Sequence, residues 1–283
     1  MTTCSPKNKV NDKIQTCYSK SELVKIATSY NKENSDKIKL NLNKLELWKA
    51  LKQKNFDKCQ NNEFCWLKQN YMKINQELNQ ELSENFRPLK PKEWNNEPNK
   101  WLNTYDILNV MKQYEEKHKN FKMIGVFPID FRTKIEGTCV SPIMCKLNIK
   151  KLVENKNTKL GFVFNLDKHY QSGSHWTSMF INLNKTSKNF GAYYYDSVGV
   201  KPPREITDFI KTLKIQSKKY FNKDMPFKYN KIQHQNGSTE CGMFSLYYLD
   251  KSLKNMSFNS FINKKGLNDN FVFKLRDIYY TKN

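Results

Sequence analysis

The sequence lacks the features of a membrane protein and of a secreted protein. No apolar run approaches the roughly 20 residues that a helix needs to cross a bilayer. The N-terminal segment Met1–Lys7 has no apolar core of the kind found in signal peptides. We therefore expect a soluble protein that is not secreted.

Cysteine and histidine are present, but not in the spacing of a disulfide framework or a metal site. The seven cysteines are an odd number, and in a chain that is not secreted we expect free thiols. Cys59 and Cys65 are six residues apart, as are Cys139 and Cys145, which is not the spacing of zinc ligands. The four histidines do not complete such a site. We expect no metal and no cofactor.

Acidic residues are scarce relative to basic ones. The chain has 49 Lys and Arg against 27 Asp and Glu, a formal net charge of +22 at pH 7. Such a charge speeds association with polyanions, so a surface that binds DNA without sequence specificity is one interpretation. Because lysine is scattered along the whole chain and not clustered, a solvated lysine surface is the simpler interpretation.

Helical periodicity dominates the first third of the chain. Ser19 and Glu22 form a capping box ahead of apolar residues at i, i+3, i+4 and i+7. Two further apolar series with helical spacing cover residues 42–51 and 67–82. The two prolines of Phe86–Pro91 then predict a linker. Residues 1–90 are therefore expected to form a helical N-terminal domain, and residues 91–283 a second domain.

Residues 91–283 carry the pattern of a sheet with helices on its faces. Compact apolar or aromatic runs bounded by turn residues predict strands, and an apolar series at helical spacing predicts a helix. Together they predict an α+β core. The expected strands cover residues 160–166, 175–183, 190–195 and 227–235, and the expected helical face covers residues 206–213.

Cys241 stands between a polar, turn-forming run and an unbroken apolar run. Ser238 and Thr239 are good N-cap residues, so we expect Cys241 in the first turn of a buried helix. The helix dipole and the unpaired N–H groups there favour an anion, and hence the nucleophilic thiolate. On local sequence alone, the alternative is a buried structural cysteine at a helix start.

Two candidate partners of Cys241 stand at the ends of expected strands. His175 opens one strand and could serve as a general base. Asp196 closes the next strand, and it would accept the imidazole N–H if the two strands pair. A turn-forming Asp at the end of a strand is the alternative for Asp196.

Four motifs, taken together and in this order, resemble those of the SUMO-protease/adenain clan of cysteine peptidases. They are His175-Trp176, Asp196-Ser197, Gln235 and Glu240-Cys241-Gly242. The chain is most similar to the large-DNA-virus branch, which includes the African swine fever virus polyprotein protease. The resemblance covers residues 101–253. It implies a papain-like, adenain-like α+β core, a mixed central sheet flanked by helices, behind an N-terminal helical arm domain.

The resemblance also implies roles for individual residues. Cys241 would be the nucleophile, His175 the base, and Asp196 the third member of the triad. Gln235 would donate one hydrogen bond to the oxyanion, and the Cys241 main-chain N–H would donate another. Trp176 would border the substrate channel.

Alternatives exist for three of these assignments. His169 lies close to His175 in the sequence, but no clan motif surrounds it. Gln233 competes with Gln235, because the local Asn-Gly spacing differs by one residue from that of the SUMO proteases. Trp176 could be an ordinary core tryptophan.

The function that the resemblance implies is a thiol endopeptidase that matures viral core polyproteins at Gly-rich sites such as Gly-Gly-Xaa. It would act as a monomer in the virion and the host cytoplasm, with the polyprotein as partner. A second hypothesis is an isopeptidase that removes SUMO or ubiquitin-like proteins from lysines. A third is a basic virion protein that associates with nucleic acid and has no turnover; the presence of Cys241, His175 and Gln235 argues against it.

Overall fold

The computed structural model describes residues 4–8 and 16–282. The first three residues of the N-terminal segment compared with signal peptides therefore lie outside the described part. The chain divides into two compact units, Met1–Lys90 together with Asp277–Asn283, and Pro91–Arg276. The division after Lys90 falls where the prolines predict a linker. Residues 277–283, which the sequence assigns to the second domain, belong to the first unit.

Short helices make up the first unit. The capping box is confirmed, since the Ser19 hydroxyl accepts from Glu22 N and the Glu22 carboxylate accepts from Ser19 N. The apolar series over residues 67–82 forms no single helix, because the Asn75 side chain accepts from Leu78 N and starts a new one. The helices are α1 (Lys20–Glu33), α2 (Lys44–Lys54), α3 (Phe56–Cys59), the 3-10 helix η1 (Glu63–Lys68), α4 (Asn70–Lys73) and α5 (Gln76–Ser83); α13 (Arg276–Tyr279) begins at the unit boundary.

An aromatic cluster fills the centre of the first unit. Tyr18 stacks on Trp66 with ring centroids 5.9 Å apart, and Phe86 meets Tyr18 edge-on at 5.4 Å. The C-terminal segment joins this unit through main-chain bonds from Thr281 N to Pro88 O (2.8 Å) and from Lys90 N to Thr281 O (2.9 Å). The end of the chain is thus tied to the residues that leave the unit.

The cysteines correct one expectation. Six of the seven form disulfides, and one is free: the pairs are Cys4–Cys17, Cys59–Cys65 and Cys139–Cys145, and the free thiol is Cys241. The expectation of free thiols is therefore wrong for these six. A separation of six residues suits a disulfide when a turn brings the Cα atoms within reach, and they lie 5.4 and 6.6 Å apart in the last two pairs.

The second unit is built on a five-stranded mixed sheet in the order β1-β4-β5-β6-β7. Its outer pairs, β1 with β4 and β6 with β7, are parallel, and its inner pairs are antiparallel. The strands are β1 (Phe121–Pro128), β4 (Lys159–Asn165), β5 (Trp176–Asn182), β6 (Gly191–Tyr195) and β7 (Phe227–Tyr229), with β2 (Lys134–Ile135) and β3 (Thr138–Cys139) in a separate hairpin.

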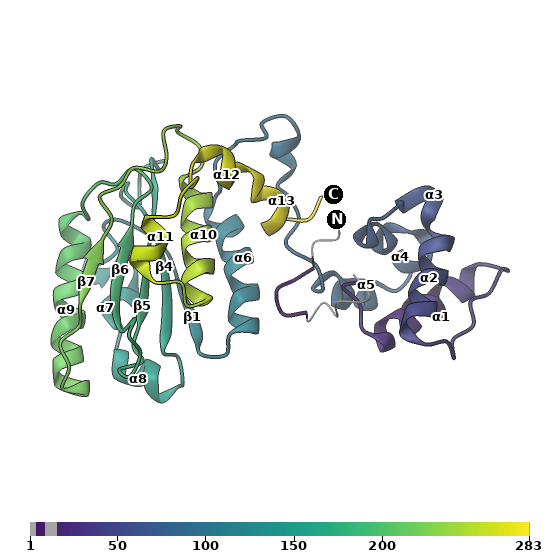
Figure 1. Cartoon of the computed structure of the whole chain (residues 1–283), viewed down its shortest axis with the longest axis horizontal. Helices are drawn as coiled ribbons and strands as arrows, with labels where there is room; N and C mark the ends of the chain where they lie inside the picture. The colour runs from purple at the N-terminus through teal and green to yellow at the C-terminus, as the bar shows by residue number, and fades with distance from the viewer. Residues whose placement is uncertain (1–3, 9–15, 283) are drawn as a thin grey trace. The chain divides into compact units, whose positions relative to one another are not determined.

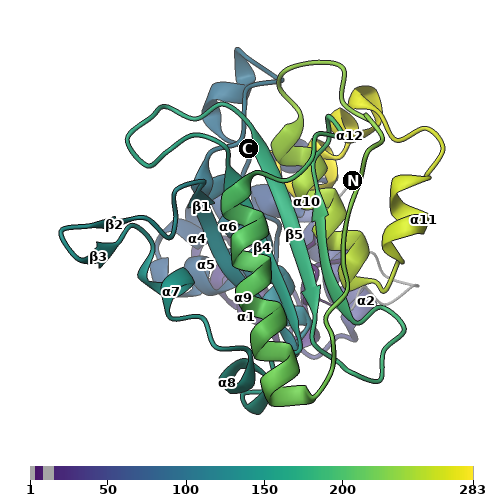
Figure 2. The same ribbon diagram turned by 90° about the vertical axis from the view of Figure 1, so that its left-hand side faces the viewer.

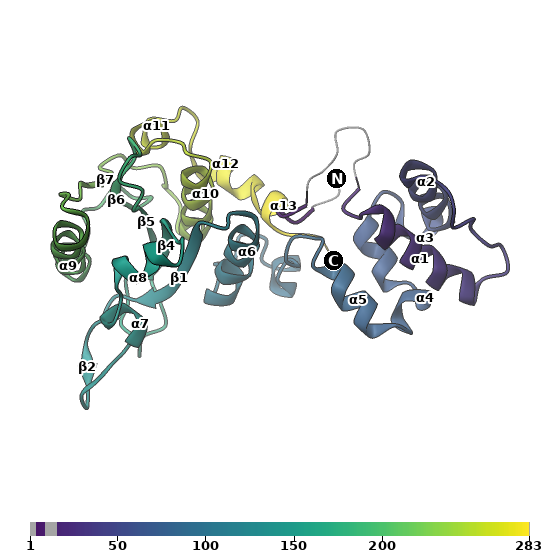
Figure 3. The same ribbon diagram turned by 90° about the horizontal axis from the view of Figure 1, so that it is seen from below.

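Helices cover both faces of this sheet. α9 lies on one face, and α6 and α10 lie on the other (Figures 1 and 3); Figure 2 views the sheet from the α9 side. The predicted α+β core is confirmed. The helices of this unit are η2 (Lys92–Asn95), α6 (Thr104–Lys117), α7 (Pro142–Cys145), α8 (Ile149–Glu154), α9 (Arg204–Phe221), α10 (Cys241–Leu253), α11 (Phe258–Ile262) and α12 (Asp269–Lys274).

Packing explains why α10 is mostly apolar. Each of its residues from Cys241 to Asp250 is buried, because the helix lies against the sheet on one side and against α6 and α12 on others. On the opposite face, α9 packs its Phe209 ring edge-on against Phe162 of β4, with centroids 5.9 Å apart. Because the helix is enclosed in this way, the position of its first residue is fixed.

Two local expectations differ from the structure. The strand expected over residues 227–235 ends at Tyr229, because the Asn230 side chain binds the main chain of Asp196 and Ile232 and turns the segment away from the sheet. Neither Ser238 nor Thr239 caps α10. The N-cap residue is Glu240, whose side chain makes no capping bond.

Within the part of the chain that the structure describes, no helix is both long enough and apolar enough to cross a membrane.

Candidate active site

The pairing of β5 with β6 brings two of the candidate residues together. His175 directly precedes β5 and Asp196 directly follows β6. The two strands are antiparallel, with Ser178 opposite Tyr195. The start of one strand therefore lies beside the end of the other, and residues far apart in the sequence meet at one edge of the sheet.

His175 and Asp196 form a close pair in which the carboxylate is buried and the imidazole partly buried. His175 Nε2 lies 2.8 Å from Asp196 Oδ1, and the two side chains are 17% and 1% exposed. The same oxygen accepts from Val198 N at 3.0 Å. The Asn230 side chain accepts from Asp196 N and donates to Asp196 O, so the carboxylate is held through its main chain as well.

Cys241 is the first residue of α10 and is 1% exposed. Its thiol lies close enough to His175 to affect the pKa of the imidazole. Because Nε2 of that imidazole faces Asp196, Nδ1 is the nitrogen left for the thiol. Burial lowers the pKa of His175, but hydrogen bonds and charge interactions with Asp196 and Cys241 outweigh it and raise the pKa to about 9. The site thus favours an imidazolium beside the sulfur.

Ser197 connects Gln235 to the His175–Asp196 pair. The Ser197 hydroxyl donates to Gln235 Oε1 over 2.6 Å, and Ser197 O accepts from Gln235 N at 3.0 Å. Gln235 Nε2 donates to Gly237 O at 2.8 Å. Gln235 is 2% exposed, so its carboxamide has one defined orientation in which Nε2 has a second hydrogen to donate.

Two residues considered as alternatives lie elsewhere. The exposed Gln233 donates from Nε2 to Gln235 O at 2.9 Å, so it braces the loop main chain. His169 pairs with a different carboxylate, Asp130, whose Oδ2 lies 2.7 Å from His169 Nδ1. The structure thus brings together His175, Asp196 and Cys241, but not His169.

Trp176 is the first residue of β5, and its indole contacts the segment that precedes α6. Its Nε1 donates to Leu102 O at 2.8 Å, and Trp176 as a whole is 7% exposed. Leu102 also lies against Gly242, where an added Cβ would come within 3.0 Å of it. A residue larger than glycine at position 242 would therefore press on Leu102. The indole is therefore fixed in place.

The loop that precedes Cys241 is anchored by the C-terminal part of the unit. Arg276 Nη2 lies 3.0 Å from Glu240 Oε1, and the two side chains are 3% and 5% exposed. The guanidinium also stacks on Trp94 at 4.3 Å and donates to Lys100 O at 2.9 Å. Burial raises the pKa of Glu240, and Arg276 opposes that rise. Earlier in the loop, Asp269 Oδ2 accepts from Asn236 N and Gly237 N.

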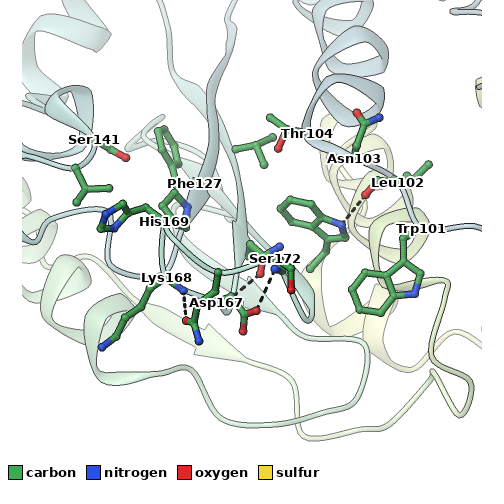
Figure 4. Close-up of a pocket in the computed structure, with 17 residues that line it drawn as sticks. Trp101, Leu102, Asn103, Thr104, Phe127, Ser141, Asp167, Lys168, His169 and Ser172 are labelled. Atoms are coloured by element: carbon green, nitrogen blue, oxygen red, sulfur yellow. Dashed lines mark hydrogen bonds between the residues drawn. The ribbon is translucent and has the colours of Figure 1, made fainter.

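A cavity of about 560 Å³ opens beside Trp176 (Figure 4). Trp101 and Leu102 line one end, and the loop from Asn165 to Gly173 lines one side. Among residues 4–8 and 16–282, no three His, Cys, Asp or Glu side chains gather in a way that could hold a metal ion.

Sequence reasoning missed several parts of this site. Ser197 was visible within the Asp196-Ser197 motif, but nothing local indicates that it binds Gln235. Arg276 and Trp101 lie far from Cys241 in the sequence, and no spacing rule links them to it. Trp101 could have been found as an aromatic residue just ahead of a helix N-cap, Asn103, whose side chain accepts from Asp106 N.

Comparison with known proteins shows which fold and which protease family the chain resembles. The profile of the Ulp1 protease family, C-terminal catalytic domain, matches residues 158–283, which include His175, Trp176, Asp196, Gln235 and Cys241. The crystal structure of a protease of African swine fever virus has a similar fold. It matches with a TM-score of 0.68 and 18% identity over 99% of this chain and 96% of that chain.

Two viral proteins are similar in sequence. A protein of Acanthamoeba polyphaga mimivirus, whose name describes a thiol protease, is 27% identical over 99% of this chain and 93% of its own length. The SUMO-1 cysteine protease of African swine fever virus is 26% identical over 59% of this chain and 56% of its own length. Residues 158–283 thus match the catalytic domain of the Ulp1 protease family, and the chain is a cysteine peptidase.

Proposed function

We propose that the chain is an endopeptidase whose catalytic triad is Cys241, His175 and Asp196. The observation that carries this proposal is the His175 imidazole, which lies 2.8 Å from the Asp196 carboxylate and whose pKa is raised by both Asp196 and Cys241. A raised imidazole pKa supports transfer of the thiol proton to His175, which yields a thiolate–imidazolium pair.

In the first step, the Cys241 thiolate attacks the carbonyl carbon of the scissile peptide bond. A C–S bond forms, and the carbonyl electrons move to the oxygen. Two donors are suited to this oxyanion: the second hydrogen of Gln235 Nε2, and the main-chain N–H of Cys241, which has no partner within its helix because it opens α10.

The tetrahedral intermediate then collapses to an acyl-enzyme. His175 gives its proton to the departing amine, the C–N bond breaks, and the new N-terminus leaves. The neutral imidazole next takes a proton from water, which attacks the thioester and releases the acid and the thiol. Asp196 keeps the imidazole oriented through both steps and stabilises its charged form.

We further propose that the substrate is a viral polyprotein cut at Gly-rich sites. Trp176 is held by its bond to Leu102 O and cannot swing out of the way, so a bulky side chain just before the scissile bond would collide with it. Glycine has no Cβ and fits an extended main chain pressed against protein. The viral origin of the relatives favours a viral substrate, and the helical first unit would then dock the polyprotein.

A second candidate is the removal of ubiquitin-like proteins from lysine side chains, by the same chemistry. It is favoured by the name of the African swine fever virus relative, SUMO-1 cysteine protease. A third, a basic protein that associates with nucleic acid without turnover, has only the net charge of +22 in its favour.

One experiment separates the three candidates. Wild type and Cys241→Ala are incubated with a polyprotein that contains Gly-Gly sites, with SUMO and ubiquitin conjugates, and with DNA. The proposal predicts that wild type cuts the polyprotein fastest and that Cys241→Ala cuts nothing. Faster release of SUMO or ubiquitin would favour the second candidate, and DNA binding with no cleavage by wild type would favour the third.

A further inference from the structure

The residues that line the cavity include Trp176, the neighbour of His175, but none of the three proposed triad residues. The cavity volume of about 560 Å³ lies in the range of ligand-binding sites, about 300–1,000 Å³. Trp101 and Leu102 line one end, whereas His169 lies at the opposite end, next to Ser141 and Phe127 (Figure 4). If Trp176 contacts the residues just before the cut, this far end receives residues farther upstream.

The loop that forms one wall of the cavity is held in a fixed shape. The Asp167 carboxylate accepts from Gly173 N at 3.0 Å and from the Ser174 hydroxyl at 2.6 Å. Asn165 Oδ1 accepts from Asp167 N at 3.0 Å and from Ser174 N at 3.2 Å. Because hydrogen bonds join its two ends, the loop holds His169 in a defined position.

A second histidine–carboxylate pair stands at the far end and takes no part in the proposed triad. Asp130 is 7% exposed, and both of its oxygens contact His169: Oδ1 accepts from the main-chain N at 3.0 Å, and Oδ2 lies 2.7 Å from Nδ1. The His169 side chain is 36% exposed. Asp130 therefore fixes the ring with Nδ1 inward, and Nε2 on the other side of the ring is left for a ligand.

The groups at this end suit a negatively charged ligand. The carboxylates of Asp130 and Asp167 are already engaged by donors of the loop. Lys168 lines the cavity while its Nζ lies over the Tyr170 ring, and the Ser141 hydroxyl makes no capping bond to α7. His169 can donate from Nε2 when it is charged, with its charge balanced by Asp130.

We propose that His169, held by Asp130, is a specificity residue that binds the carboxylate of an Asp or Glu side chain of the substrate, upstream of the Gly-rich site. This inference rests on the proposed function, since it assigns the far end of the cavity to the same substrate chain. The acidic residue of the substrate has no role in the chemical steps. It adds a charged hydrogen bond that selects which Gly-rich sites are cut.

The test is a cleavage profile on a diverse peptide library, read by sequencing the cut products. Wild type should enrich Asp and Glu over Asn and Gln at one upstream position by about tenfold, the effect of one charged hydrogen bond. His169→Gln and Asp130→Asn should each reduce this ratio toward one. His118→Gln, at a histidine outside the cavity, is the matched control and should keep the ratio of wild type.

Kinetics on single peptides sharpen the test. In wild type, a Glu peptide and its Gln counterpart should differ in kcat/KM because they differ in KM and not in kcat, since the contact lies away from the reacting atoms. An unchanged Glu preference in His169→Gln, or no acidic preference in wild type at any upstream position, would overturn the inference. Failure of the proposed function would appear separately, as a cleavage profile without glycine next to the cut.

Discussion

Replacing Ser197 with alanine would remove the hydroxyl that holds the Gln235 carboxamide. That hydroxyl donates to Gln235 Oε1 over 2.6 Å, and Gln235 is 2% exposed, so water has little access to take its place. The main-chain bonds from His234 N and Gln235 N to Ser197 O would remain. The substitution therefore frees the carboxamide without displacing the segment that carries it.

The size of the effect follows from the contact that is lost. A buried carbonyl oxygen left without its donor costs about 1–3 kcal/mol. The orientation of the carboxamide that points Nε2 of Gln235 at the oxyanion is therefore destabilised by this amount relative to its other orientations. Since about 1.4 kcal/mol is a factor of ten, we expect kcat to fall about five- to 150-fold in Ser197→Ala. Complete loss of one oxyanion donor, about 100- to 1,000-fold, sets the upper bound.

The assay combines turnover with chemical reactivity of the thiol. In Ser197→Ala, kcat on a Gly-rich peptide should fall while KM changes little, because the donor acts on charge that develops in the transition state. Alkylation of Cys241 by iodoacetamide should keep the rate of wild type, since His175 and Asp196 are untouched. Ser217→Ala is the matched control: its buried hydroxyl donates to Lys223 O at 2.7 Å in α9, away from the site.

A double-mutant cycle decides whether Ser197 acts through Gln235. In a Gln235→Ala background, the change Ser197→Ala should cost almost nothing more, because no carboxamide is left to orient. Full activity in Ser197→Ala, or losses that multiply in the double mutant, would refute this reasoning.

Three other predictions can be checked. Because the Asp196 carboxylate helps to raise the pKa of His175 to about 9, activity should decline as pH rises through about 9. Asp196→Asn should move that decline to lower pH. A pH profile whose alkaline decline does not move would contradict the role assigned to Asp196. Arg276→Met should lower the free energy of unfolding by about 3–5 kcal/mol, because Glu240 is left buried and unpaired. Lys100→Met, which breaks an exposed pair with Glu97, should lower it by about 0–1 kcal/mol. Chemical denaturation measures both values. If the +22 surface binds a polyanion, DNA should bind at low salt and dissociate steeply as salt rises, and binding that ignores salt would exclude it.

Local patterns predicted the elements that carry the site. Compact apolar or aromatic runs bounded by turn residues indicated the strands that begin after His175 and end before Asp196, and the apolar run after Cys241 indicated α10. These predictions succeeded because each depends on residues that are neighbours in the sequence. The order of the motifs then restricted the candidates for base and nucleophile to single residues.

Contacts between distant segments could not be predicted in the same way. The Arg276–Glu240 pair and the Ser197–Gln235 bond join residues 36 and 38 positions apart. The strand expected to reach Gln235 stops at Tyr229, because a single asparagine, Asn230, binds main-chain groups of Asp196 and Ile232. The cysteine pairs were missed for the same reason, since a disulfide depends on where turns bring the Cα atoms.

The most direct test of the central claim is the site and rate of covalent labelling by a Gly-rich peptide that ends in a thiol-reactive electrophile. Mass spectrometry of the labelled protein should find the peptide on Cys241 alone, with labelling lost in Cys241→Ala and strongly slowed in His175→Ala. A label on any other cysteine, or equal labelling rates in wild type and His175→Ala, would contradict a Cys241 nucleophile activated by His175.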